Sequence, residues 1–155
     1  MNLAPSSSRR GHLRGFTLIE LLVVIAIIGI LSAVVLVALN TARSKGSDAA
    51  VKSDLTTIMT EAAIYYDGTG AQSYGTAGTS CNATGSVFLD PVIVNAIAGI
   101  TGSGTTYSPV CNNTNTTFMV YVPLQNPATG MQGFCVDSTG AEKADTTLTS
   151  SATKC

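Results

Sequence analysis

Residues 14–20 read Arg-Gly-Phe-Thr-Leu-Ile-Glu, and they lead directly into an uncharged apolar run from Leu21 to Leu39. The run meets the length of roughly 18 residues that a membrane-spanning helix needs. Glu20 lies at the head of this run, where a carboxylate is costly in hydrocarbon unless something neutralises it. The sequence therefore predicts a helix that is held in a membrane and is completed by a partner.

The composition allows one modest domain with an appendage, because the chain has 155 residues. Charged residues make up 11%, well below the roughly 25% of ordinary soluble domains. Three of the eight basic residues, Arg9, Arg10 and Arg14, precede the run, which leaves five basic against nine acidic side chains beyond Gly15. This balance lacks the polybasic footprint of a nucleic-acid-binding protein, so we expect no nucleic-acid partner.

The residue types of an active site are missing from most of the chain. The only histidine, His12, precedes Gly15, and without that segment no histidine is left for a triad, a general base or a metal site. The sequence also has no Gly-rich phosphate loop of the required spacing and no Cys-x-x-Cys pair. We therefore expect no catalytic residue and no cofactor, and the chain is predicted not to be an enzyme.

Four cysteines follow the apolar run, at positions 81, 111, 135 and 155. An even number at wide spacing, in a segment outside the membrane, indicates two disulfides; free buried thiols that act as small hydrophobes are the alternative. Three pairings are possible. We favour Cys81–Cys111 with Cys135–Cys155, because sequential pairs close the shorter loops.

The N-terminal segment has three interpretations. A secretory signal peptide also combines arginines with an apolar region, but that region is usually about 7–15 residues long and ends in a small-x-small cleavage site. Here the run is longer, and residues 38–42 offer a poor site of that type. A simple membrane anchor, with the arginines holding the N-terminus in the cytoplasm, explains everything except Glu20 and the short preface.

The third interpretation comes from a family. Gly15, followed by Phe-Thr-Leu-Ile-Glu-Leu-Leu over residues 16–22, closely resembles the class III signal of type IV pilins and of the pseudopilins of type II secretion systems. In that family a prepilin peptidase cuts after the glycine, on the cytoplasmic side, and then methylates the new amino terminus. The resemblance covers about the first quarter of the chain. It implies that residues 1–15 are a leader and that cleavage leaves an N-methylated Phe16.

The resemblance also implies residues that act in assembly. In the family, the glutamate of one subunit meets the N-terminal amine of its neighbour, so Glu20 and the amine of Phe16 are expected to pair between copies. Such a pair adds little stability but strongly penalises a wrong register; the alternative is a carboxylate that snorkels to the headgroups without a partner. Gly29 matches a family glycine. The run lacks the helix-kinking proline of the best-known type IV pilins, so any local melting during assembly is expected near Gly29 to Ser32 and not at a proline.

The helix is predicted to continue beyond Asn40 and to become amphipathic, because apolar residues recur on one face at helical spacing. We therefore divide the chain into a leader (1–15), a transmembrane and assembly half of the helix (16–40), an amphipathic half (41–66) and a globular head (67–155). The residues of the apolar face are Val51, Leu55, Ile58, Met59, Ala62, Ala63 and Tyr66.

The C-terminal half completes a predicted α+β fold of the pilin type. Asp90-Pro91 is typical of an N-cap followed by proline at the first helical position, and Gly99 is expected to end that short helix. β-Branched and aromatic residues predict strands over 117–122, around 134–136 and over 145–148. We expect these strands to form a small antiparallel sheet packed on the amphipathic half of the long helix. The isoleucines expected to face the core from the short helix are Ile93, Ile97 and Ile100.

Two further patterns lie in the head. Asp137, Glu142 and Asp145 cluster around a Gly-containing turn. Some secretion pseudopilins bind calcium through carboxylates in a C-terminal loop, so these residues are weak calcium candidates, although a solvated turn is the more typical explanation. Asn-x-Thr sequons at Asn82, Asn112 and Asn115 arise easily by chance in such an Asn/Thr-rich sequence.

These features favour a structural subunit of a type IV pilus that polymerises as a homo-oligomer. The resemblance implies a prepilin peptidase, an inner-membrane platform protein and an assembly ATPase as partners, and membrane lipid before assembly. It implies a single-pass precursor in the cytoplasmic membrane with a cytoplasmic N-terminus, and then an extracellular pilus. The rivals are a major pseudopilin of a type II secretion system, which usually lacks such disulfides, and a minor or tip pilin that binds a ligand in adhesion or DNA uptake. The acidic balance argues against DNA.

Overall fold

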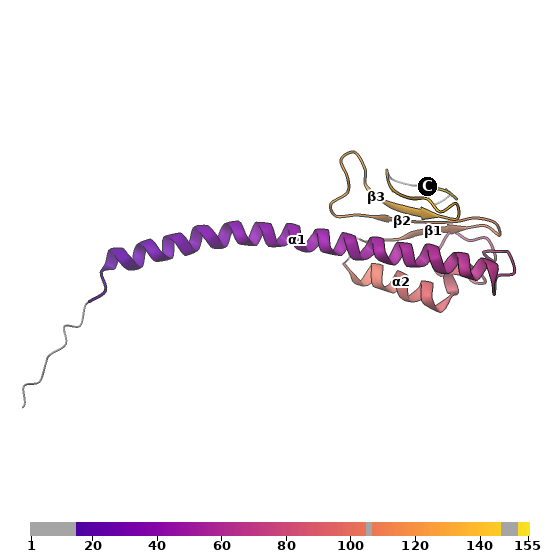
Figure 1. The fold of residues 1–155 in the computed structure, drawn as a ribbon, viewed down its shortest axis with the longest axis horizontal. Helices are drawn as coiled ribbons and strands as arrows, with labels where there is room; N and C mark the ends of the chain where they lie inside the picture. The colour runs from indigo at the N-terminus through magenta and orange to yellow at the C-terminus, as the bar shows by residue number, and fades with distance from the viewer. Residues whose placement is uncertain (1–14, 105–106, 147–151) are drawn as a thin grey trace, which may run out of the picture. The chain divides into compact units, whose positions relative to one another are not determined.

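In a computed structural model, which describes residues 15–104, 107–146 and 152–155, the chain begins with one long helix, α1 (Leu18–Asp67), and ends in a four-stranded sheet (Figure 1). The chain divides into two compact units, Met1–Asn40 and Thr41–Cys155, and α1 continues through both. A long N-terminal helix followed by a small antiparallel sheet confirms the predicted α+β arrangement.

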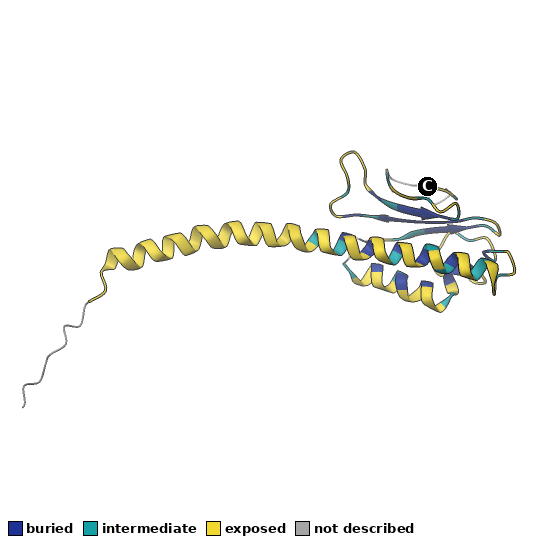
Figure 2. Ribbon diagram, in the orientation of Figure 1, coloured by how far each residue is buried: buried dark blue, intermediate teal, exposed yellow. Residues whose placement is uncertain are grey.

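Every described residue of the first unit is exposed (Figure 2). This part of α1 is apolar on all sides, so no orientation of the helix could hide its surface against a single neighbouring element. Its large side chains, from Phe16 to Leu39, are each between 47% and 80% exposed. A continuous apolar surface of this kind requires a membrane or other chains around it.

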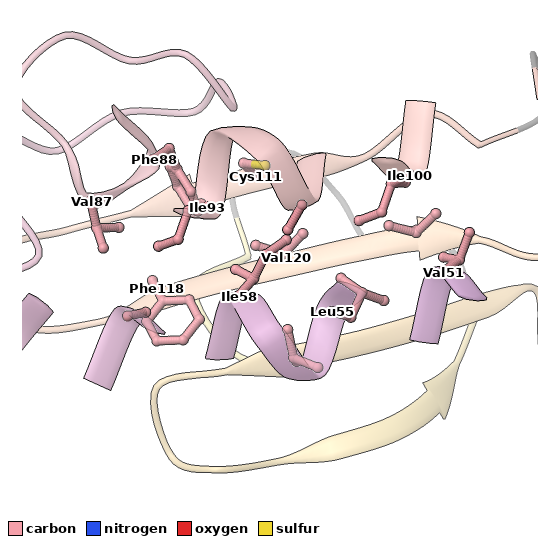
Figure 3. Packing of buried hydrophobic residues seen from close by; sticks show 14 of the residues in the cluster. Val51, Leu55, Ile58, Val87, Phe88, Ile93, Ile100, Cys111, Phe118 and Val120 are labelled. Carbon is pink, nitrogen blue, oxygen red and sulfur yellow. The ribbon is translucent and has the colours of Figure 1, made fainter. Parts of the chain in front are cut away.

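The second half of α1 contributes one face to the core of unit 2. Val51, Leu55, Ile58 and Ala62 are fully buried and follow the helical spacing expected of them. Residues from the 3₁₀ turn η1 (Val87–Leu89) and from α2 (Pro91–Gly102) join the same cluster (Figure 3). They are Val87, Phe88, Ile93, Ala96 and Ile100, and Ile97 packs against them.

α2 begins where the sequence predicts but ends later. The Asp90 carboxylate accepts a hydrogen bond from the Val92 N–H (2.9 Å), and Pro91 occupies the first turn. The predicted end at Gly99 is wrong, because α2 continues to Gly102. A Cβ at position 99 would lie 2.8 Å from Oδ2 of Asp54, so this glycine leaves room for α1 instead of ending α2.

The sheet contains β1 (Val110–Asn113), β2 (Phe118–Pro123), β3 (Gly133–Asp137) and β4 (Glu142–Asp145) in that order, and all neighbours are antiparallel. β2 and β3 lie where strands are predicted. β4 follows the turn at Gly140 and shares only Asp145 with the strand predicted over 145–148. Residues 147 and 148 lie outside the described part of the chain. β1 is not predicted, because two of its four residues are asparagines, which strands usually avoid.

The central strand β2 is buried on both faces of the sheet. Phe118, Val120 and Val122 belong to the main core, whereas Met119 and Tyr121 lie in a second cluster with Cys135. Cys135 therefore lies on the face opposite Val136, as strand alternation requires. Val110, Ala152 and Cys155 pack against this second cluster, so the last residues of the chain cover the outer face of the sheet.

Candidate functional site

The first turn of α1 is closed by two polar side chains that cap each other. The Thr17 N–H and hydroxyl donate to Oε2 of Glu20 at 2.9 and 2.8 Å, and the Glu20 N–H donates to the Thr17 hydroxyl oxygen at 3.2 Å. This reciprocal pattern is a capping box, and it satisfies backbone donors that a helix start leaves open. Glu20 therefore has a partner within its own chain; whether it also pairs with the amine of a neighbouring Phe16 stays a prediction.

The surface beside Glu20 is apolar and slightly hollowed. Phe16, Ile19, Val23 and Val24 line, together with Glu20, an open depression of about 440 Å³. Gly29 lies on the same helix, and a Cβ there would meet no atom within 4 Å, so packing within the chain does not require this glycine. The helix that begins at Leu18 is long and apolar enough to cross a membrane.

The four cysteines form two disulfides in the structure. Cys81 and Cys111 are joined with an S–S distance of 1.97 Å, and Cys135 and Cys155 with 1.98 Å. These are the two pairs that sequential pairing predicts. The first bridge belongs to the main core, and the second attaches the C-terminal tail to the outer face of the sheet.

The calcium candidates do not come together as a cation site. Within the described residues, no group of three or more His, Cys, Asp or Glu side chains is placed to hold a metal ion. Asp137 is 2% exposed and accepts hydrogen bonds from the N–H groups of Thr139, Ala141 and Cys155 and from the Thr139 hydroxyl. Burial alone would raise the pKa of Asp137, but these hydrogen bonds together hold it below its usual value. Glu142 is exposed, and Asp145 accepts from the N–H of Thr146.

The three sequons have different surroundings. Asn82 and Asn115 are exposed. Asn112 is 5% exposed, and its amide donates to the carbonyl of Ala152 (2.6 Å), which leaves it no room for an attached group.

A buried carboxylate that is not predicted from the sequence lies at the start of the amphipathic half of α1. Asp48 is 5% exposed: Oδ1 accepts hydrogen bonds from the Tyr107 hydroxyl and the Gln125 N–H (both 2.9 Å), and Oδ2 accepts one from the Asn126 N–H (2.7 Å). Burial, the hydrogen bond from the Tyr107 hydroxyl to Asp48 and the negative charge of Asp48 together raise the pKa of Tyr107 to about 12. We call this arrangement the Asp48 clasp. The position of Asp48 could have indicated the clasp, because Asp48 lies three residues before Val51 on a face of the helix that is otherwise apolar.

The helix and sheet define a pilin-like arrangement. Residues 12–36 match a family model described as the prokaryotic N-terminal methylation motif, which is the class III signal of type IV pilins and pseudopilins. The matched segment contains Gly15, Phe16, Glu20 and Gly29. Comparison with curated proteins gave no match, and neither did comparison with solved structures.

Proposed function

We propose that the protein is a structural subunit of a type IV pilus, made as a membrane-anchored precursor, cut between Gly15 and Phe16, and polymerised through residues 16–40. One observation carries the proposal. A helix long enough to cross a membrane begins within the methylation motif, and its apolar half is exposed at every described position. A homopolymer would bury this surface between neighbouring helices, and a repeated head-to-tail contact of this kind generates a helical filament.

Glu20 is proposed to act in two stages. Before assembly it lies in an apolar segment, where a charge costs on the order of 2.5–3.5 kcal/mol. The two hydrogen bonds from Thr17 to Oε2 offset part of that cost within the single chain. During assembly, the resemblance supplies a second partner, the methylated amine of Phe16 on a neighbouring subunit. Thr17 thus holds the carboxylate in position until that amine arrives.

The partners and the location follow from the same signal. A prepilin peptidase removes the leader, and a platform protein and an assembly ATPase in the inner membrane move the subunit into the filament. The leader arginines hold the N-terminus in the cytoplasm, so the head lies on the other side of the membrane. The filament is then extracellular, where the two disulfides persist.

A major pseudopilin is the second candidate, because the same signal precedes both kinds of subunit. Two disulfides in the head favour the pilus. Deletion of the gene in the source cell separates the two: we expect surface filaments, seen by electron microscopy, to disappear while protein secretion continues, and wild-type protein to restore them. A parent cell without filaments that loses secretion on deletion would assign the chain to a pseudopilus. A subunit that is rare within purified filaments would instead be a minor or tip pilin.

A further inference from the structure

The charges of α1 are sorted along its length. After Glu20 the next two charged residues are Arg43 and Lys45, and both are exposed. The next charged residues are the buried Asp48 and the exposed Lys52, whose ammonium lies 5.1 Å from the centroid of the Phe134 ring. Asp54, Glu61 and Asp67 follow nearer the end of the helix. The first turns of the helix in unit 2 therefore carry two exposed cations, and its last turns carry three carboxylates.

The nearest carboxylate lies inside unit 2 and is hydrogen-bonded to other groups. Asp48 is held inward by the clasp, where the Tyr107 hydroxyl and two N–H groups occupy its oxygens. The clasp also brings the loop between β2 and β3 to the same turns of α1, since the Asn126 amide donates to the Ser44 hydroxyl oxygen (2.8 Å). This loop, residues 124–132, contains no charged side chain.

Position along the helix points to the partner. At 1.5 Å per residue, Arg43 and Lys45 lie about 6 and 9 Å beyond Leu39, the end of the apolar run. The polar headgroup layer begins where the hydrocarbon ends and is about 5–8 Å thick on each side. Long basic side chains extend several ångströms to place their charges in that layer. When the apolar run spans a bilayer, both cations are within reach of lipid phosphates.

We propose that Arg43 and Lys45 form a binding surface for anionic lipid headgroups, on the side of the membrane where the head lies. The inference rests on the membrane-anchored stage of the proposed function. Attraction to an anionic surface favours association by about fivefold for each Lys or Arg. The surface would hold residues 43–45 at the headgroup layer until the subunit leaves the bilayer.

The test uses the full chain reconstituted in phosphatidylcholine bilayers with a trace of spin-labelled phosphatidylglycerol or spin-labelled phosphatidylcholine. Electron paramagnetic resonance separates lipid that is immobilised at the protein from bulk lipid, and gives the ratio of the two association constants. R43Q/K45Q is compared with wild type and with K143Q/K154Q, which removes the same charge from β4 and the tail. The leader arginines contribute equally in all three proteins.

Wild type and K143Q/K154Q should prefer phosphatidylglycerol equally, and R43Q/K45Q should lose roughly fivefold or more of that preference. Added salt should bring wild type to the level of R43Q/K45Q. An equal preference for phosphatidylglycerol in all three proteins, or an equal loss of it in both double variants, overturns this inference but leaves the proposed function standing. The inference is also overturned if R43Q/K45Q keeps the lipid preference of wild type but forms fewer filaments, because Arg43 and Lys45 would then contact a second copy of the chain. If alkaline carbonate extracts the protein from the bilayer, the protein is not anchored in the membrane, and the proposed membrane-anchored precursor is refuted as well.

Discussion

The two halves of α1 share one secondary structure and have opposite surroundings. Residues 18–40 are exposed on every side, whereas residues 41–67 bury a stripe that runs from Asp48 to Ala62 (Figure 2). The difference lies in the distribution of apolar side chains, which encircle the first half and occupy one face of the second. One helix therefore has two separable tasks, and a substitution in one half should leave the other task intact.

Glu20→Val should produce the largest effect, and only on assembly. Valine fits the apolar helix, so the variant still inserts in the membrane and its head unfolds as in wild type. Without the carboxylate, the register between subunits is unspecified, and we expect filament yield to fall roughly tenfold or more. Filaments are counted by electron microscopy, with Glu142→Gln as the charge control. Normal filaments from Glu20→Val would refute the register argument.

Leu55→Ala tests the core half of the comparison. Leu55 is fully buried among α1, α2 and the sheet, so its truncation should lower the free energy of unfolding of the head by about 2–5 kcal/mol. Ile27→Ala removes a similar side chain that is 52% exposed, and should leave that free energy unchanged. Urea unfolding of both proteins in detergent, followed by near-ultraviolet circular dichroism, measures the difference. Equal losses would mean that the two halves are not independent.

Asp48→Ala should weaken the head by about 2–3 kcal/mol, because the Tyr107 hydroxyl and the N–H groups of Gln125 and Asn126 lose a charged acceptor. Hydrogen exchange should show the loop between β2 and β3 opening more often. Asp67→Ala, on the exposed end of the same helix, should change stability by less than about 0.5 kcal/mol. If Asp48→Ala is as stable to unfolding as Asp67→Ala, the hydrogen bonds of the Asp48 clasp do not stabilise the head.

Asp137→Asn should produce the smallest effect, about 1 kcal/mol at neutral pH. The folded state lowers the pKa of Asp137, so the carboxylate stabilises the head fully above its unfolded pKa of about 3.9. That contribution is lost as the pH falls through the lower, folded value. Urea unfolding across acidic pH should therefore show a steeper loss for wild type than for the variant. Parallel curves would exclude Asp137 as a source of the acid sensitivity.

Much of this fold could be predicted, because its signals are local. The apolar run and the spacing of Val51, Leu55 and Ile58 define α1, and Asp90-Pro91 marks the start of α2. The missed features depend on distant partners. β1 is held by pairing with β2, and the Asp48 clasp joins residues that lie 59 to 78 positions apart. The pattern predicts a helix end at Gly99, because the sequence does not show that Asp54 of α1 lies close to this glycine.

The site divides in the same way. The proposed processing signal is contiguous, so Gly15, Phe16 and Glu20 are recognised from the sequence, and they lie within the matched motif. The capping of Glu20 by Thr17 is also local, since three residues separate them. What Glu20 meets in the assembled state depends on other chains, and a single chain does not contain that contact.

Intact-mass spectrometry of the subunit from purified surface filaments tests the central claim most directly. We predict a chain of residues 16–155 that carries one methyl group and, because of its two disulfides, has four hydrogens fewer than the reduced chain. A chain that still begins at Met1, that lacks the methyl group, or that is absent from the filaments would contradict it.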